Sequence, residues 1–162
     1  MSLLSQELKL RTKVMKNRIA MPPMANRVAT EEGAVVPDLI GHYTDRAKER
    51  IGLVIVEHSY VHPSGKAHNL QLALDKDELL DGLSLLASSI REQGALAAIQ
   101  ITHAGSKTTA EVLGQTPVGP SAIANPSAGD EPRELTGKEM AGLKEAYVRA
   151  ALRAEKAGFD AV

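Results

Sequence analysis

Short apolar runs alternate with amphipathic stretches along most of the chain. Residues 53–56 form a continuous apolar run, and residues 96–101 form another that only Gln100 interrupts; such runs are typical of parallel strands covered on both faces. Apolar positions three or four residues apart predict helices over about residues 37–50, after Asp77 and after Thr136. The pattern therefore alternates strands with helices.

Three further segments complete this order. Residues 18–21 predict a short strand that ends at Pro22, because proline cannot donate to a sheet and restricts the residue before it. Residues 159–162 predict the start of another strand, and a weak alternation over about residues 8–17 suits a short hairpin ahead of the domain. The predicted order is strand, helix, strand, helix, strand, helix, strand.

The helix boundaries carry capping signals. Pro37 suits a first helical position, Asp77 suits an N-cap, and Thr136 with Glu139 has the spacing of a capping box. The predicted buried faces are Ile40, Tyr43 and Ala47 in the first helix, the stripe from Leu79 to Ile90 in the second, and Met140, Leu143, Tyr147, Ala150, Ala151 and Ala154 in the third.

The connections differ in length. Helix-to-strand turns are short and contain glycine, whereas strand-to-helix loops are long, and the longest is the irregular segment 102–135. This difference favours parallel strand-helix units that bind a ligand at the carboxyl ends of the strands. A dinucleotide-binding sheet would carry G-x-G-x-x-G and a P-loop would end in Gly-Lys-Ser/Thr, and the sequence has neither. We predict one domain over residues 1–162, the N-terminal half of a (β/α)8 TIM barrel with about four strands, because a closed barrel needs about 250 residues.

Composition and charge narrow the partners. The chain has 19 basic and 20 acidic residues and a formal net charge of −1, with no basic block, so we expect a small-molecule partner and neither nucleic acid nor a membrane. It has no cysteine, which excludes disulfides and thiolate chemistry and favours a cytoplasmic location. No stretch approaches the roughly 18 apolar residues of a membrane helix.

Polar side chains stand where the predicted strands end. Glu57 and His58 follow the second strand, and Gln100 and His103 end the third. Gln100 is either satisfied by the backbone or a ligand contact, and His103 either orients its loop or approaches a substrate. Glu57 is either a buried acid with a raised pKa or a carboxylate paired with a basic residue.

Other polar residues lie in the predicted loops or near them. His58, His62 and His68 raise the question of a metal, but no acidic residue has the spacing of a known site, so we predict no metal centre. Arg27 and Lys107 either face an anionic substrate or phosphate or remain solvated surface charges.

Six motifs follow one another along the chain. They are Lys16-Asn17-Arg18-Ile19 with Met21-Pro22-Pro23-Met24, His42-Tyr43 with Arg46-Ala47, Gly52 to Glu57, Gln100 to Gly105, Gly119-Pro120-Ser121, and Ala154 to Asp160. In order and spacing these motifs resemble the old yellow enzyme family of FMN-dependent NADH:flavin oxidoreductases. The resemblance extends from about Leu8 onward, and the six motifs together carry it.

The resemblance implies FMN across the carboxyl ends of the strands and NADH or NADPH as reductant. It places the backbone of Pro23, Met24 and Ala25 beside the flavin ring, His58 at its edge, and the amide of Gln100 on its pyrimidine ring. An amide offers a donor and an acceptor together, which suits the alternating polar edge of a flavin. The implied reaction passes a hydride through FMN to an alkene activated by a carbonyl group.

Several positions depart from the family pattern. Ala25 stands where related bacterial enzymes often have cysteine, Ser106 stands where arginine is usual, and His58 is larger than the residue we expect there. In the family the fourth strand continues into Glu-x-His, whose histidine helps to bind the substrate carbonyl, and this motif would fall beyond Val162. The catalytic residues are therefore not assigned within the chain.

Alternatives remain at this point. We expect the rest of the barrel to be a second chain, the half-barrel to associate with itself, or the sequence to be a truncated piece that is catalytically incomplete. A competing hypothesis is a non-catalytic half-barrel module that associates through its open sheet edges. A third is another barrel with a phosphate-bearing ligand and a similar first half.

Overall fold

A parallel sheet forms the centre of the molecule, which is described from a computed structural model over residues 2–127 and 130–162. The sheet contains β3 (Ala20–Met21), β4 (Leu53–Tyr60) and β5 (Leu96–Thr102) in that order. A single parallel bridge joins Ala98 of β5 to Ala161, where we predicted a fourth strand. The predicted order of parallel strands is thus observed, with the fourth reduced to one bridge.

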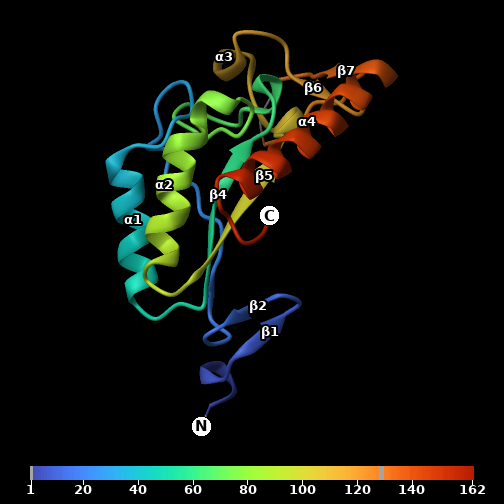
Figure 1. Ribbon diagram of the computed structural model, residues 1–162. Coiled ribbons are helices and arrows are strands. Elements are labelled where there is room, and N and C mark those ends of the chain that lie inside the picture. The colour runs from blue at the N-terminus through green and yellow to red at the C-terminus, as the bar shows by residue number, and fades with distance from the viewer. Residues whose placement is uncertain (1, 128–129) are drawn as a thin grey trace.

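Three helices cover one face of this sheet (Figure 1). They are α1 (Pro37–Lys48), α2 (Leu80–Arg91) and α4 (Gly137–Lys156); α1 contacts β4, and both α2 and α4 contact β5. A helix therefore follows each strand and packs back on the sheet, which is the arrangement of a partial (β/α) barrel.

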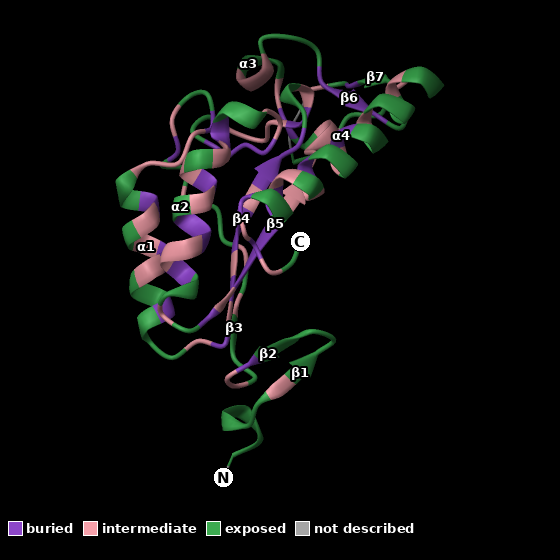
Figure 2. Cartoon of the chain, viewed as in Figure 1, coloured by how far each residue is buried: buried purple, intermediate pink, exposed green. Residues whose placement is uncertain are grey.

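The hydrophobic core lies between the sheet and these helices. Figure 2 shows buried residues along β4 and β5 and on the helix sides that face them. Val54 and Val56 of β4 are fully buried there, while Leu53 and Ile55, which alternate with them, line a groove on the opposite face of the sheet. The outer face thus holds the core and the inner face is open.

The helices differ from the sequence prediction in detail. Leu39, and not Ile40, joins Tyr43 and Ala47 on the fully buried stripe of α1. The buried stripe of α4 is Ala146, Ala150 and Ala154, whereas Met140 is 52% exposed. Small alanines form the fully buried stripe, the predicted Tyr147 is half-buried and packs against the core, and Met140 lies outside this contact.

The capping predictions have mixed outcomes. Thr136 accepts from the backbone of Glu139 at 3.2 Å and Glu139 accepts in return at 2.8 Å, so the predicted capping box is confirmed. Asp77 does not cap α2: a 3-10 turn (Asp77–Leu79) precedes that helix, and the Asp77 carboxylate accepts from Arg153 of α4 at 2.6 Å. This carboxylate therefore links two segments and leaves the start of α2 without a side-chain cap.

The strand β4 is longer than predicted and contains a bulge. Val56 pairs with Ile99 and Ser59 with Ile101, so β4 holds one residue more than β5 between these pairs. Glu57 and His58 occupy the bulge. They are therefore part of the strand, whereas the sequence placed them after its end.

Smaller elements flank the half-barrel. The segment predicted to be irregular contains α3 (Ala110–Leu113) and a parallel pair of β6 (Val118–Gly119) and β7 (Arg133–Glu134). At the other end, β1 (Leu8–Leu10) and β2 (Lys13–Met15) form an antiparallel hairpin below the amino ends of the strands (Figure 1). No helix in the described part of the chain is both long and apolar enough to cross a membrane.

Candidate functional site

A groove of about 450 Å³ runs along the inner face of the sheet. Its walls are mostly apolar, and Gln100 is the polar side chain among them; the lining residues are Pro23, Leu53, Ile55, Ala98, Ile99, Gln100, Ile101, Ala161 and Val162. Gln100 is exposed and lies near the carboxyl end of β5, and Pro23 is the second residue after β3. The structure therefore brings two of the predicted cofactor-binding positions, Pro23 and Gln100, to one groove on the inner face of the sheet.

The loop after β3 carries the next predicted positions. Met24 is 62% exposed and Ala25 is also exposed. Asn26, which follows them, is fixed to β4: its backbone N–H and its side-chain amide both donate to Oε2 of Glu57, at 2.9 and 2.7 Å. The segment from Pro23 to Ala25 is thus held between a strand and a double hydrogen bond.

Glu57 is fully buried, and its partners are amide and phenol groups. Besides the two bonds from Asn26, Tyr43 of α1 contacts Oε2 at 3.4 Å and accepts the backbone N–H of Glu57 at 2.8 Å. Burial raises the pKa of Tyr43, so its hydroxyl keeps its proton. For Glu57 we predicted either a buried acid with a raised pKa or a carboxylate paired with a basic residue. The observed partners are Asn26 and Tyr43, neither of which is basic, and their hydrogen bonds anchor the loop after β3.

His58 sits between Gln71 and His68. Oε1 of Gln71 accepts the N–H of Ala67, so its amide nitrogen faces His58 and lies 3.2 Å from Nδ1 and 3.0 Å from the backbone oxygen. Nδ1 of His58 is therefore an acceptor, and its proton is on Nε2, 3.2 Å from Nε2 of His68. Burial, then His68 and Arg27, lower the pKa of His58 and keep the ring neutral near pH 7.

His103 connects two loops and is not among the groove-lining residues. Its Nδ1 accepts the N–H of Gly105 at 3.0 Å, so Nε2 carries the proton and donates to Oγ of Ser64 at 3.0 Å. Ser64 in turn lies 2.8 Å from Nδ1 of His62. Burial, and then His62, lower the pKa of His103. These contacts give His103 a role in orienting the loops that follow β4 and β5.

The two predicted cationic candidates lie in different places. Arg27 is exposed, has a left-handed backbone with φ of 57°, and belongs to the loop that Asn26 anchors. Lys107 ends a 3-10 turn (Gly105–Lys107) after β5 and does not line the groove. Only Arg27 is therefore close to the anchored segment. Within residues 2–127 and 130–162 no three histidine or acidic side chains come together as a metal site.

Several residues that shape the site were not predicted from the sequence. Asn26 and Gln71 bind Glu57 and His58 of β4 from the loops before and after it, and Ser64 binds His103 in the loop after β5. Gly65 has no room for a side chain, because a Cβ there would collide with the ring of His103. Their signal in the sequence is only a polar or small residue in a loop, so long-range contact was needed to identify them.

The comparison with known proteins agrees with this geometry. The sequence pattern of the NADH:flavin oxidoreductase / NADH oxidase family matches residues 4–162. The chain belongs to this family. The resemblance to old yellow enzyme proteins is thereby confirmed, and enzymes of the family are NAD(P)H oxidoreductases that use FMN.

Individual relatives within the family are similar over part of their length. An NADH oxidase of Thermoanaerobacter brockii is 42% identical over 92% of this chain and 23% of its own length. An NADPH dehydrogenase of Clostridium acetobutylicum is 37% identical over 91% of the chain and 43% of its own. Morphinone reductase in complex with tetrahydroNAD superposes with a TM-score of 0.90 at 26% identity, over 99% of this chain and 48% of that structure. The chain thus spans less than half the length of each of these proteins.

Proposed function

We propose that this chain is the FMN-binding half-barrel of an NAD(P)H-dependent oxidoreductase that reduces alkenes conjugated to a carbonyl group. The observation that carries the proposal is the exposed amide of Gln100 in an apolar groove that it shares with Pro23. The family of the chain supports the same conclusion, because its enzymes use FMN and a nicotinamide reductant. The cytoplasmic location expected from the sequence stays a prediction.

The residues of the groove fit one side of a flavin. An apolar wall accepts the flat ring, and a single amide supplies one donor and one acceptor for a ring edge on which they alternate. Pro23, Met24 and Ala25 would hold the ring through their backbone, and His58 would approach its edge. Bound FMN would supply the chemistry of accepting a hydride from NADH or NADPH and passing it to the alkene.

The residues of this chain bind and orient in this proposal. Asn26 and Glu57 fix the loop after β3, so the Pro23–Ala25 backbone is positioned before any ligand arrives. Gln100 selects the orientation of the ring because only one of its edges can pair with the amide. The proposal assigns no proton donor or acceptor to the described residues.

Flavin binding can be measured on the purified chain. FMN added in increments should lose fluorescence as it binds, and Gln100→Leu should weaken binding by about tenfold, since one hydrogen bond to a polar ring is lost. Gln115→Leu removes an exposed glutamine outside the groove and should bind FMN as the parent chain does. Equal FMN affinity in the parent and Gln100→Leu, or binding by neither, would contradict the proposed role of Gln100.

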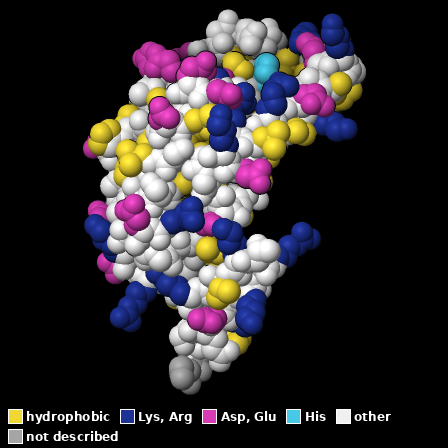
Figure 3. Space-filling view, viewed as in Figure 1, with side chains coloured by type: hydrophobic (Ala, Val, Ile, Leu, Met, Phe, Trp, Pro, Cys, Tyr) yellow, Lys and Arg dark blue, Asp and Glu magenta, His cyan; other side chains and the backbone are white. Residues whose placement is uncertain are grey.

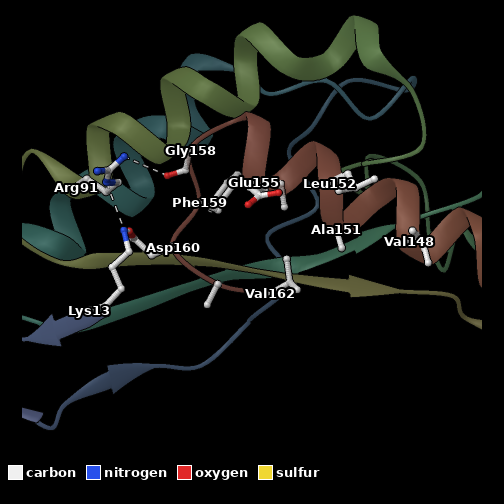
Figure 4. A pocket seen from close by; sticks show the side chains of 12 residues that line it. Lys13, Arg91, Val148, Ala151, Leu152, Glu155, Gly158, Phe159, Asp160 and Val162 are labelled. Carbon is white, nitrogen blue, oxygen red and sulfur yellow. Dashed lines mark hydrogen bonds and ion pairs between the residues drawn. The ribbon is translucent and has the colours of Figure 1, made fainter. Parts of the chain in front are cut away.

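A second candidate function is self-association, which one surface of the chain favours. A groove of about 650 Å³ beside α4 is lined by Val148, Leu152, Phe159 and Val162, with Lys13, Arg91 and Asp160 at one end (Figure 4). Figure 3 shows hydrophobic side chains exposed over α4. An open sheet edge beside exposed apolar side chains is suited to pairing with a second copy of the chain.

The association state separates the two candidates. Light scattering after size exclusion should give a dimer that Leu152→Lys converts to a monomer, because a charge would then be buried in the contact. Leu85→Lys is the matched control, since Leu85 is 55% and Leu152 is 57% exposed and Leu85 lies on α2, away from this groove. A parent chain that is monomeric at all concentrations would refute self-association and leave FMN binding unaffected.

A further inference from the structure

Ser64 lies between two imidazoles in the loop after β4. Its Oγ is 2.8 Å from Nδ1 of His62 and 3.0 Å from Nε2 of His103. Nδ1 of His103 accepts the N–H of Gly105, so its Nε2 carries the proton and donates to the serine oxygen. Nδ1 of His62 accepts the backbone N–H of Ser64 at 3.2 Å, so this nitrogen carries no proton. The serine hydroxyl therefore donates its own proton to His62.

This direction of hydrogen bonding is the one that activates a serine. An imidazole nitrogen that accepts the hydroxyl proton can remove it when the oxygen attacks a carbonyl carbon, and the 2.8 Å contact is within the range for a nucleophile and its base. The N–H of His103 meets the same oxygen and would stabilise the negative charge that grows on it as the proton leaves. Ser64 thus has a base on one side and a hydrogen-bond donor on the other.

Backbone contacts hold this arrangement in place. Ser64 is the middle residue of a 3-10 turn (Pro63–Gly65), and Ala104 in the loop after β5 donates its N–H to the backbone oxygen of Gly65 at 3.0 Å. A Cβ on Gly65 would collide with the ring of His103, so the turn and this ring are in close contact. The serine and its two imidazoles are therefore positioned by the fold before any ligand binds.

A pocket of about 600 Å³ opens beside Ser64, which is partly exposed, and His62. Both side chains line it, and Val118, Leu135 and Leu143 add apolar surface to its wall. The volume is in the range of pockets that hold small organic ligands. This pocket shares no lining residue with the groove on the inner face of the sheet. The serine is therefore accessible to a small ligand with an apolar part, at a place separate from the proposed flavin contacts.

We propose that Ser64 is a nucleophile that takes the acyl group of small carboxylic esters, with His62 as its general base. Oγ of Ser64 forms a bond to the carbonyl carbon while Nδ1 of His62 takes the hydroxyl proton. The bond from that carbon to the leaving oxygen then breaks, and His62 returns the proton to the leaving alcohol. Water hydrolyses the acyl-serine by the same two steps, so that ester and water give acid and alcohol. The reaction involves no electron transfer, and it is independent of the proposed flavin chemistry.

The reaction can be followed without FMN on the full 162-residue chain. The probe is p-nitrophenyl acetate, whose released nitrophenolate is measured by its absorbance. The parent chain should release about one equivalent of nitrophenolate in a rapid burst, because acylation of the serine precedes hydrolysis of the acyl-serine. Protein quenched with acid during the burst, digested and examined by mass spectrometry should carry the acetyl group on Ser64.

Single substitutions separate the serine from its base. Ser64→Ala should abolish the burst, and His62→Gln should slow acylation about 100-fold, because the positioned base is lost. Ser88→Ala is the matched control and should react as the parent does. Ser88 is also partly exposed, but its hydroxyl donates to the backbone oxygen of Leu85 at 3.0 Å and not to an imidazole. Circular dichroism checks that each variant is folded.

Three results would overturn the proposal. They are an unchanged burst in Ser64→Ala, an acylation rate in His62→Gln equal to that of the parent, and a parent chain whose acetyl group is absent or lies on a histidine or lysine in place of Ser64. Should Ser64→Ala fail to fold, the position of the acetyl group in the parent chain decides the matter. Because no flavin is added, failure here is separate from failure of FMN binding in the Gln100 experiment.

Discussion

Asn26 donates two hydrogen bonds to one carboxylate oxygen of Glu57, one from its backbone and one from its side chain. This places the loop after β3 against the bulge of β4, although the two residues are 31 positions apart. The Pro23–Ala25 backbone and Arg27 flank this link on its two sides. The geometry of the proposed flavin contacts therefore depends on this pair of residues.

Removing the Asn26 side chain should destabilise the protein. Asn26→Ala deletes the 2.7 Å bond to a buried carboxylate and should lower the free energy of unfolding by about 1–3 kcal/mol, as for a hydrogen bond to a charged group. Urea unfolding followed by circular dichroism measures this change. Asn125→Ala, in a loop where Asn125 contacts only its neighbour Ser127, should cost much less. Equal losses would mean that the Asn26–Glu57 link does not stabilise the fold.

Two glycines should respond to alanine in opposite directions. Gly65→Ala places a methyl group against the ring and the Cα of His103 and should destabilise by about 1–3 kcal/mol, because the loops after β4 and β5 must separate. Gly142→Ala, in α4 with nothing near its Cβ, should stabilise by about 0.5–1 kcal/mol. Thermal unfolding of the two variants and the parent decides the matter; a stable Gly65→Ala would refute the close contact.

Acid should weaken the start of α4. The side chain of Arg133, and then the backbone and hydroxyl of Thr136, lower the pKa of Glu139 to about 2 from 4.5. A lowered carboxyl pKa stabilises the fold above the unfolded value, so this contribution is present above pH 4.5 and is lost as the pH falls toward 2. A carboxyl carbon titration by NMR should show the low midpoint. Arg133→Gln should move it upward, and an unchanged midpoint would contradict the ion pair.

The histidines should weaken the fold at mildly acid pH. Burial is the main cause that lowers the pKa of His42, His58 and His103 below 6.5, so the unfolded chain binds more protons than the folded one in this range. The free energy of unfolding should therefore be highest above pH 6.5, where these rings are neutral in both states, and should fall as the pH drops toward their lowered pKa values in the folded protein. Urea midpoints between pH 7.5 and pH 5 measure the slope. His103→Gln should reduce it, whereas a slope identical to the parent would show that His103 does not contribute.

The regular elements could be predicted from the sequence because their signals are local. The apolar run at residues 53–56, the alanine and leucine spacing of the helices, and the Thr136–Glu139 capping box each lie within a few residues. The predicted N-cap of α2 was wrong because the decisive contact is not local. Asp77 has a side chain that could cap a helix, but its carboxylate instead accepts a hydrogen bond from Arg153, which is 76 positions away.

The candidate site was predictable only in part. The resemblance led to Gln100 and Pro23, which the structure brings to one groove. The bulge could not be foreseen, because nothing in the letters Glu57-His58-Ser59 marks an extra residue in a strand. The contacts of Asn26 and Gln71 likewise join loops to the bulge of β4. Such contacts depend on how strands are placed in space, and periodicity along the chain carries no information about this.

The bulge in β4 also decides which face of the sheet each later side chain of the strand points to. Leu53 and Ile55 face the groove, and strict alternation would send Glu57 there too, yet Glu57 meets Tyr43 on the helix side. The single inserted residue thus turns the Glu57 carboxylate away from the groove and toward α1. Deletion of His58 alone would restore strict alternation along β4, and the carboxylate would then face the apolar inner wall of the sheet.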